Sequence, residues 1–328
     1  MSEDLHGEFK YGDRVQLTGP KNRMHSFILE RGGVFHTHKG LLPHSAVVGL
    51  PEGSVVSNGT DDYLALRPLL RDFVMSMPRG ATIIYPKDSA QILMSTGIAP
   101  GSRVLEAGAG SGALSLSIIQ AIGSTGELIS FERREEFARV ARANVLTYFG
   151  HLPENWRLIE ADVVEGFDSE IAPASLDKVI LDLLAPWDCV SGASKTLKPG
   201  GVLLCYVATV TQLSRVVEAI RDSENFTEPE SSESLVRTWH VEGLAVRPDH
   251  RMVAHTAFIT TARRLAPGTK LPVQRKRNKP EYSDEDIEMW SPGSLGIGES
   301  TAKRARKAAR RAEVASQRAT KPPSAGDA

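Results

Sequence analysis

Between residues 83 and 266, short apolar runs alternate with segments in which apolar residues recur at helical spacing. The runs predict strands at 103–108, 126–132, 156–162, 176–183 and 200–209. The other segments predict helices at 87–97, 112–123, 134–149, 187–197 and 211–223, the first of them capped by Asp88 or Ser89. Strands that alternate with helices indicate a parallel, doubly wound α/β sheet. Two further strands, 232–244 and 255–265, have no helix between them, so we expect an antiparallel hairpin at one edge.

The first part of the chain has a different pattern. Residues 8–56 hold short β-type runs broken by Gly, Pro and Asn, with no helical period. A connector follows, with one short helix expected from Leu64 to Met75. We therefore expect a small β-rich N-terminal domain (1–60), a connector (61–82), a large α/β domain (83–266) and a basic, disordered tail (267–328).

The composition argues against a membrane span and against a signal peptide. The 328 residues contain no run near the ~18 apolar residues of a membrane span, and the acidic start MSEDLHGEF is unlike a signal peptide. The two cysteines, Cys189 and Cys205, lie in apolar contexts and are expected to be buried thiols in a reducing compartment. We therefore expect a cytoplasmic protein that does not enter a membrane.

Charge is divided unevenly along the chain. The net charge is −1, but from Arg263 to the C-terminus 15 basic residues face 8 acidic ones, a net of +7 that leaves −8 on the first 262 residues. A basic segment of this kind predicts contact with a polyanion. A solvated tail without a partner is the alternative.

A glycine-rich turn follows the first strand of the α/β domain. VLEAGAGSGALS, residues 104–115, reads as Gly108-x-Gly110-x-x-Ala113, which fits a dinucleotide-binding loop. It also reads as Glu106-x-Gly108-x-Gly110-x-Gly112, which resembles the first motif of S-adenosylmethionine (AdoMet) methyltransferases. A tight strand–helix connection without a ligand is the third interpretation.

Two acidic residues at neighbouring strand ends help to choose among these interpretations. Glu132 ends the second strand and suits a ribose diol, in NAD or in AdoMet. Asp162 ends the third strand and suits the exocyclic amine of adenine in AdoMet enzymes. The terminal hairpin is likewise typical of the class I methyltransferase fold, a Rossmann-like, mostly parallel sheet, and is absent from dinucleotide-binding domains. AdoMet is therefore the expected cofactor, held by these residues: Tyr85, Glu106, Gly108, Gly110, Ser111, Gly112, Ala113, Leu114, Glu132, Arg133, Asp162, Val163 and Asp182.

Several further stretches resemble one family. The fourth strand ends in DLLAPW, with Asp182, Pro186 and Trp187, which resembles the Asp-x-x-x-Pro-Trp signature of the bacterial-type tRNA (adenine-58-N1)-methyltransferases, the TrmI family. IIYPKDSAQIL, LLCYVATVTQL and RPDHRMVAHTAFITTARR are similar to other segments of that family. Together with the small N-terminal β domain, the resemblance spans residues 8–266 and leaves the basic tail outside.

The resemblance implies methylation of N1 of adenine 58 in the tRNA T-loop, extrusion of that base, and a homotetramer. A carboxylate at Asp182 fits this chemistry, since it can accept a hydrogen bond from the adenine N6 amine and stabilise the charge that develops on the ring. Tyr206 is the second candidate catalytic residue, either stacked on the adenine or a core tyrosine. Tyr85 packs on AdoMet or lines the same pocket. A helix cap is the structural alternative for Asp182.

Other functions remain open on the sequence alone. An AdoMet methyltransferase that acts on another RNA, a protein or a small molecule would share the fold, and so would a non-catalytic RNA-binding module. His36, His38 and His44 form an H-x-H…H set, but no acidic or cysteine residue completes it. We therefore expect no metal, and a solvated or RNA-facing histidine cluster.

Overall fold

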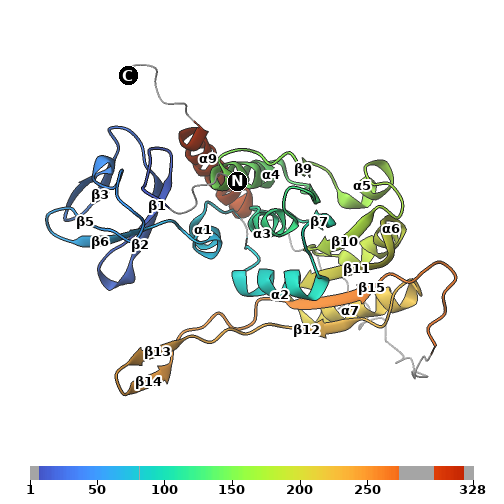
Figure 1. The fold of residues 1–328 in the computed structure, drawn as a ribbon. Coiled ribbons are helices and arrows are strands. Elements are labelled where there is room, and N and C mark those ends of the chain that lie inside the picture. Colours follow the sequence, from blue (N-terminus) through green and yellow to red (C-terminus); the bar gives the residue numbers. More distant parts are fainter. Residues whose placement is uncertain (1–6, 81, 273–298, 321–328) are drawn as a thin grey trace.

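A seven-stranded sheet forms the centre of the large domain in the computed structural model, which describes residues 7–80, 82–272 and 299–320 (Figure 1). The strand order is β12-β15-β11-β10-β7-β8-β9. The strands β11, β10, β7, β8 and β9 are parallel, and β15 is antiparallel to β11 and β12. Their bounds are β7 Arg103–Ala107, β8 Glu127–Phe131, β9 Trp156–Ile159, β10 Leu176–Leu181, β11 Leu197–Val207, β12 Glu230–Ser232 and β15 Phe258–Arg263.

Helices cover both faces of this sheet, which explains why its central strands β7, β8 and β11 are mostly buried and apolar. Val104 of β7 packs toward α1–α4, while its neighbour Leu105 packs toward α5–α7. This mostly parallel, helix-flanked sheet confirms the expected fold class. The helices are α1 Leu70–Ser76, α2 Pro86–Thr96, α3 Ala113–Ile122, α4 Glu135–Phe149, α5 Val163–Ser169, α6 Val190–Thr196 and α7 Val210–Asp222.

Four local predictions differ from the structure. Helix α2 begins at Pro86 with Tyr85 at its N-cap, so neither Asp88 nor Ser89 caps it. The connector helix begins only at Leu70, because residues up to Leu66 pair in a strand. Helix α5 was not predicted, because its short sequence, VVEGFDS, has no clear period. The segment 232–244 joins the sheet only through its first residue, in β12.

The residues that follow β12 form a separate ribbon. Strand β13, Trp239–Glu242, pairs with β14, Ala245–Pro248, in a two-stranded antiparallel unit. In Figure 1 this ribbon extends away from the sheet, on the side of the N-terminal domain. The expected edge hairpin therefore exists as β12 and β15, but its connection is long and carries a ribbon of its own.

The N-terminal β region has its own core. Four strands pair in the order β2-β1-β6-β5, and a second unit pairs β3 with β4. Their bounds are β1 Arg14–Thr18, β2 Met24–Ile28, β3 Val34–Thr37, β4 Gly40–Pro43, β5 Val55–Ser57 and β6 Asp62–Leu66. Single-turn helices lie at Pro20–Asn22, His44–Ala46 and Pro186–Cys189.

One histidine of the expected exposed cluster is buried in this region. His44 is 7% exposed and stacks on Phe27 with ring centroids 4.7 Å apart, and its Nδ1 accepts the backbone N–H of Glu30 at 2.9 Å. Burial lowers the pKa of His44. The expectation of a solvated or RNA-facing cluster was therefore wrong for His44, which is a core residue.

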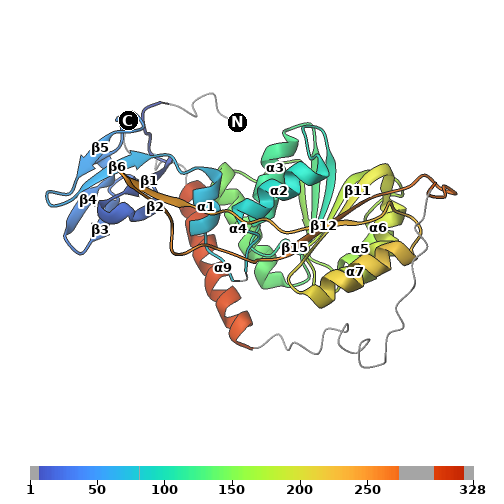
Figure 2. The ribbon, with the colours of Figure 1, turned by 90° about the horizontal axis from the view of Figure 1, so that it is seen from below.

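Part of the basic tail is helical. Helix α9, Glu299–Thr320, lies along α4 in both views (Figures 1 and 2). Its face toward α4 is made of alanines, which give almost no hydrophobic signal in a sequence. Tail residues 273–298 and 321–328 lie outside the described part, and the domain boundaries stay predictions.

Two further expectations concern burial and membranes. Cys189 and Cys205 are buried free thiols, and burial raises the pKa of both. Among the described helices, none is long and apolar enough to cross a membrane.

Candidate active site

The ends of β7, β8 and β10, which carry the glycine loop, Glu132 and Asp182, meet at the carboxyl edge of the sheet, where backbone hydrogen bonds join them. The N–H groups of Gly108 and Ala109 both donate to the carbonyl of Phe131, which ends β8. The Asp182 N–H, after β10, donates to the Ala107 carbonyl at the end of β7 at 2.9 Å. The glycine loop, Glu132 and Asp182 are therefore fixed side by side, as the strand pattern predicted.

The three glycines of the loop differ in how closely other atoms approach the position of a Cβ. A Cβ on Gly108 (φ +90°) would lie 2.1 Å from the Asp182 carbonyl oxygen. A Cβ on Gly112 (φ +80°) would lie 3.2 Å from Ala141 Cα of α4. A Cβ on Gly110 (φ +55°) would meet nothing closer than 3.8 Å. Two glycines thus permit close backbone packing, whereas Gly110 is accounted for by its positive φ, which favours glycine.

Two buried carboxylates stand behind this loop. Glu106 is 2% exposed, and its Oε2 accepts from Ser115 Oγ at 2.6 Å and Ser130 Oγ at 2.7 Å. Burial, with the Glu132 charge as a smaller cause, raises the pKa of Glu106. Glu132 is 4% exposed and accepts from the Gly110 N–H at 2.9 Å and the Arg134 N–H at 3.0 Å.

Asp182 completes an acidic cluster. Burial raises its pKa to about 7, and the charges of Glu106 and Glu132 add to this rise while Arg134 opposes it. The side chain caps neither following helix: the N-caps there are Ala185 and Cys189, without side-chain bonds. The structural alternative for Asp182 is thereby removed. Arg134 was not among the predicted residues, although it lies only two positions after Glu132.

Asp162 has a local role as well as its predicted one. It is the N-cap of α5, and its Oδ1 accepts the Val164 N–H at 3.0 Å. Its Oδ2 lies 3.4 Å from the exposed Arg133 guanidinium. Val163, which follows, is buried. A contact of this segment with the adenine of a cofactor stays a prediction, because the capping interaction alone explains an aspartate here.

Two buried polar atoms at the glycine loop are unsatisfied. Among the described residues, Ser111 Oγ and Asn144 Oδ1 have no hydrogen-bond partner. Asn144 Nδ2, from α4, donates to the Ser111 carbonyl at 2.9 Å and the Pro78 carbonyl at 2.8 Å. Unsatisfied buried groups are rare, and their occurrence beside Gly110 fits a site built for a polar ligand. Ala113 and Leu114, also predicted here, are buried in the first turn of α3.

The tyrosines predicted for the acceptor side have different surroundings. Tyr85 is half-buried at the N-cap of α2. Tyr206 is 8% exposed, and its hydroxyl donates to Asp88 Oδ2 at 2.9 Å. Burial, followed by the Asp88 charge, raises the pKa of Tyr206. The hydroxyl is therefore already engaged, which favours the core interpretation; a contact with adenine stays a prediction.

Asp88 is the centre of a network that sequence reasoning missed. The carboxylate is fully buried, and it accepts from Lys87 Nζ (2.7 Å), Ser234 Oγ (2.6 Å), Thr256 Oγ1 (2.7 Å) and Tyr206. Burial alone would raise the pKa of Asp88, but these hydrogen bonds outweigh it and hold that pKa below its usual value. Ser234 precedes the β13–β14 ribbon and Thr256 follows it, so Asp88 ties both ends of the ribbon to α2 and β11.

An exposed contact supports the same attachment. His255 Nδ1 lies 2.8 Å from Glu233 Oε2, and Nε2 lies 2.9 Å from the Ala208 carbonyl just after β11. The backbone contact with Ala208, followed by Glu233, raises the pKa of His255. The residues 255–256 that contributed to the family resemblance thus anchor the segments that lead into and out of the ribbon, beside the carboxyl end of β11.

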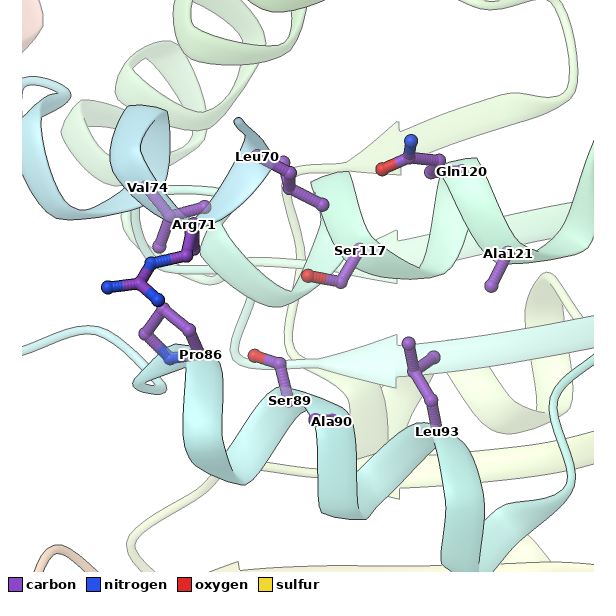
Figure 3. Close-up of a pocket in the computed structure, with 10 residues that line it drawn as sticks. All are labelled: Leu70, Arg71, Val74, Pro86, Ser89, Ala90, Leu93, Ser117, Gln120 and Ala121. Atoms are coloured by element: carbon purple, nitrogen blue, oxygen red, sulfur yellow. The ribbon is translucent and has the colours of Figure 1, made fainter. Parts of the chain in front are cut away.

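A separate pocket of about 380 Å³ lies between α1, α2 and α3 (Figure 3). Its lining contains no carboxylate and none of the predicted site residues, so it is distinct from the glycine-loop site. The lining residues are Leu70, Arg71, Val74, Pro86, Ser89, Ala90, Leu93, Ser117, Gln120 and Ala121. Within the described ranges, no group of three His, Cys, Asp or Glu side chains could hold a metal ion.

Comparison with known proteins decides the family. The family described as "tRNA methyltransferase complex GCD14 subunit" matches residues 64–255, and the family described as "TrmI-like N-terminal" matches residues 7–56. The chain is 36% identical to the tRNA (adenine(58)-N(1))-methyltransferase TrmI of Thermus thermophilus over 249 residues, which cover 76% of this chain and 95% of that protein. The chain belongs to the TrmI family.

Other TrmI relatives agree. The tRNA (adenine(57)-N(1)/adenine(58)-N(1))-methyltransferase TrmI of Methanocaldococcus jannaschii is 30% identical, covering 71% of this chain and 92% of its own length. The crystal structure of tRNA (m1A58) methyltransferase TrmI from Aquifex aeolicus has a TM-score of 0.69 at 29% identity, covering 79% of this chain and 99% of that one. A structure described as an SAM-dependent O-methyltransferase from Thermotoga maritima has a TM-score of 0.74 at 32% identity, covering 80% and 97%. The family matches end at residue 255, so α9 lies beyond the matched part.

Proposed function

We propose that this chain transfers the methyl group of AdoMet to N1 of adenine 58 in the T-loop of tRNA, with Asp182 as the catalytic residue. Membership of the TrmI family supports the reaction. The observation that carries the residue assignment is the position of Asp182: it is fixed to the glycine loop by its backbone and belongs to a cluster of three carboxylates.

The acidic cluster fits AdoMet and does not fit NAD. The Glu132 charge raises the pKa values of Glu106 and Asp182, and among the described residues Arg134 is the positive charge that opposes this at Asp182. A cationic ligand would relieve the repulsion, whereas the diphosphate of NAD would add to it. AdoMet, when bound, supplies a methyl group on a positively charged sulfonium. The unsatisfied Ser111 hydroxyl suits its polar parts.

Asp182 would orient the acceptor. N1 of adenine already carries a lone pair, so its attack on a sulfonium methyl needs no strong base. The Asp182 carboxylate would accept a hydrogen bond from the N6 amine, which directs N1 toward the methyl group. The same carboxylate would stabilise the positive charge that develops on the ring. The low exposure of the neighbouring carboxylates keeps this interaction strong, because water competes with it less.

Glu132 would hold the cofactor ribose. Glu132→Ala should weaken AdoMet binding by about 1–3 kcal/mol, since the diol loses a charged acceptor. Isothermal titration calorimetry with AdoMet and with NAD measures this directly. Glu165→Ala, a carboxylate in the first turn of α5, is the matched control and should bind AdoMet like the parent. Tight NAD binding that Glu132→Ala abolishes would contradict the cofactor assignment.

The acceptor position is tested with two transcripts. Unmodified tRNA should take up label from [methyl-³H]AdoMet, and the same transcript with G in place of A at position 58 should take up almost none. Because the target base lies inside the folded T-loop, it must leave its stack to reach Asp182, and contacts elsewhere on the tRNA must offset that loss. Equal labelling of both transcripts would exclude adenine 58 as the acceptor.

We also propose a homotetramer whose subunits meet through the β13–β14 ribbon. The ribbon exposes Trp239, Val241, Leu244 and Val246, with Leu244 fully exposed. An isolated two-stranded ribbon is only marginally stable, and a continuous apolar surface of this kind marks a protein interface. Because the family resemblance implies four subunits, light scattering should give about four times the chain mass of 35.6 kDa. Leu244→Glu should lower that mass, and a monomeric parent at micromolar concentration would exclude the assembly.

A further inference from the structure

Helix α9 has two faces of opposite character. Ala308, Ala309 and Ala312 are at most 5% exposed, whereas Lys307, Arg310 and Arg311 are exposed. We propose that α9 is a docked phosphate-binding helix that contacts the backbone of the tRNA substrate outside the active site. This inference rests on the proposed function, because that function supplies the polyanion.

The alanine face fixes the orientation of the helix. Ala308 and Ala309 form a small buried cluster with Val140 of α4. Alanine side chains allow close approach of two helix backbones, and alanine is the strongest helix former. Ala312 and Ser316 continue the buried stripe at spacings of three or four residues, as one face of a helix requires. The opposite face is therefore held outward rather than free to rotate.

The outward face is a concentrated positive surface. Lys307, Arg310 and Arg311 line a shallow hollow together with Val314. No carboxylate of the described residues lies within ion-pair distance of these three bases, although surface bases elsewhere in the chain, such as Lys195 and Lys198, are paired. Unpaired, exposed bases at helical spacing favour a run of phosphates, and arginine forks suit phosphate oxygens.

The position of α9 relates this surface to the active site. Its partner helix α4 also supports the glycine loop, since Ala141 packs against Gly112 and Asn144 binds the Ser111 carbonyl. In Figures 1 and 2, α9 lies beside α4 and is nearer to the N-terminal domain than the helices α5, α6 and α7 are. The lining of the hollow contains no aromatic residue to stack on a base. The contact should therefore add affinity without base preference.

The test neutralises two bases and leaves the helix intact. Arg310→Gln/Arg311→Gln should raise the Kd for unmodified tRNA roughly tenfold near 0.1 M salt and reduce the slope of log Kd against log salt by up to about 2. Glutamine resembles arginine in helix propensity, so α9 should persist. The matched control, Lys195→Gln/Lys198→Gln, removes the same charge from α6 and β11 and should leave the slope unchanged. The charge-preserving variant Arg310→Lys/Arg311→Lys should also bind like the parent.

A second variant keeps the full chain and removes the third base of the hollow as well. Lys307→Gln/Arg310→Gln/Arg311→Gln should reduce the slope by up to about 3, while its single-turnover rate at saturating tRNA stays near that of the parent. A parent-like salt slope in either variant would overturn the proposal, and so would an equal loss in the control. If the parent transfers no methyl to tRNA, the proposed function fails; if it does but the slopes are unchanged, only the assignment of α9 fails.

Discussion

Replacing Asp182 with alanine should lower the single-turnover rate of methyl transfer to tRNA by about 100-fold or more. The variant loses the acceptor that orients the adenine and stabilises charge on its ring. AdoMet affinity and the folded state should be largely preserved, because the backbone contact of residue 182 with Ala107 does not depend on the side chain. Asp188→Ala, an exposed carboxylate six residues along the chain, is the matched control.

The raised pKa of Asp182 gives the same variant a pH signature. The pKa of this group in the free enzyme is about 7, so below pH 7 it is mostly protonated, and it then lacks the negative charge that makes it a strong acceptor and stabilises the ring. The value of kcat/KM for AdoMet should therefore fall as pH drops through about 7. Asp182→Asn should lose this decrease in kcat/KM at low pH. The value of kcat reports the enzyme with AdoMet bound, and a bound cation lowers a carboxyl pKa, so the decrease in kcat should occur at lower pH.

The substitution Asp182→Asn should raise the stability of the fold, although it lowers activity. A carboxyl group whose pKa is raised on folding disfavours the folded state above its unfolded pKa, and the effect is complete once pH exceeds the folded value. Without cofactor, Asp182→Asn should therefore raise the Tm at pH 8 while it lowers activity. Near-normal turnover in Asp182→Ala, or an unaltered pH profile in Asp182→Asn, would remove Asp182 from the mechanism.

Asp88→Ala should destabilise the fold by about 3–5 kcal/mol, since the variant leaves a buried cation without its partner. The Lys87 side chain is only 8% exposed, and its Nζ lies 2.7 Å from Asp88 Oδ1. Three hydroxyl donors, from Tyr206, Ser234 and Thr256, lose their acceptor at the same time. Chemical denaturation of the parent and the variant measures the difference.

Two controls separate this effect from ordinary charge removal. Asp168→Ala breaks an exposed pair with Lys195 and should change stability by less than about 1 kcal/mol. Lys87→Met/Asp88→Leu removes both charges and should recover part of the loss. Because the folded pKa of Asp88 is lowered, its contribution is present above the unfolded pKa and disappears as pH falls through the folded value. A loss of under about 1 kcal/mol in Asp88→Ala would contradict the role assigned to the network.

The positions of the strand ends were predictable, because the spacing of apolar residues and the residues of the turns mark where each strand stops. Gly108, Glu132 and Asp182 each follow an apolar run, and parallel strands bring such positions to one edge. The Asp88 network was not predictable, because its hydroxyl partners lie 118 to 168 residues away and no local pattern distinguishes a buried carboxylate from a cap. Likewise, only the packed helix reveals that the alanines of α9 form one face.

Identifying the methylated nucleoside tests most directly whether this chain methylates N1 of adenine 58. Unmodified tRNA incubated with the protein and AdoMet would be digested with a specific ribonuclease, and the products analysed by liquid chromatography and mass spectrometry against 1-methyladenosine and N6-methyladenosine standards. We expect one added methyl group, present as 1-methyladenosine in the fragment that contains position 58. Methylation at N6, on a ribose oxygen, or only in other fragments would contradict this expectation.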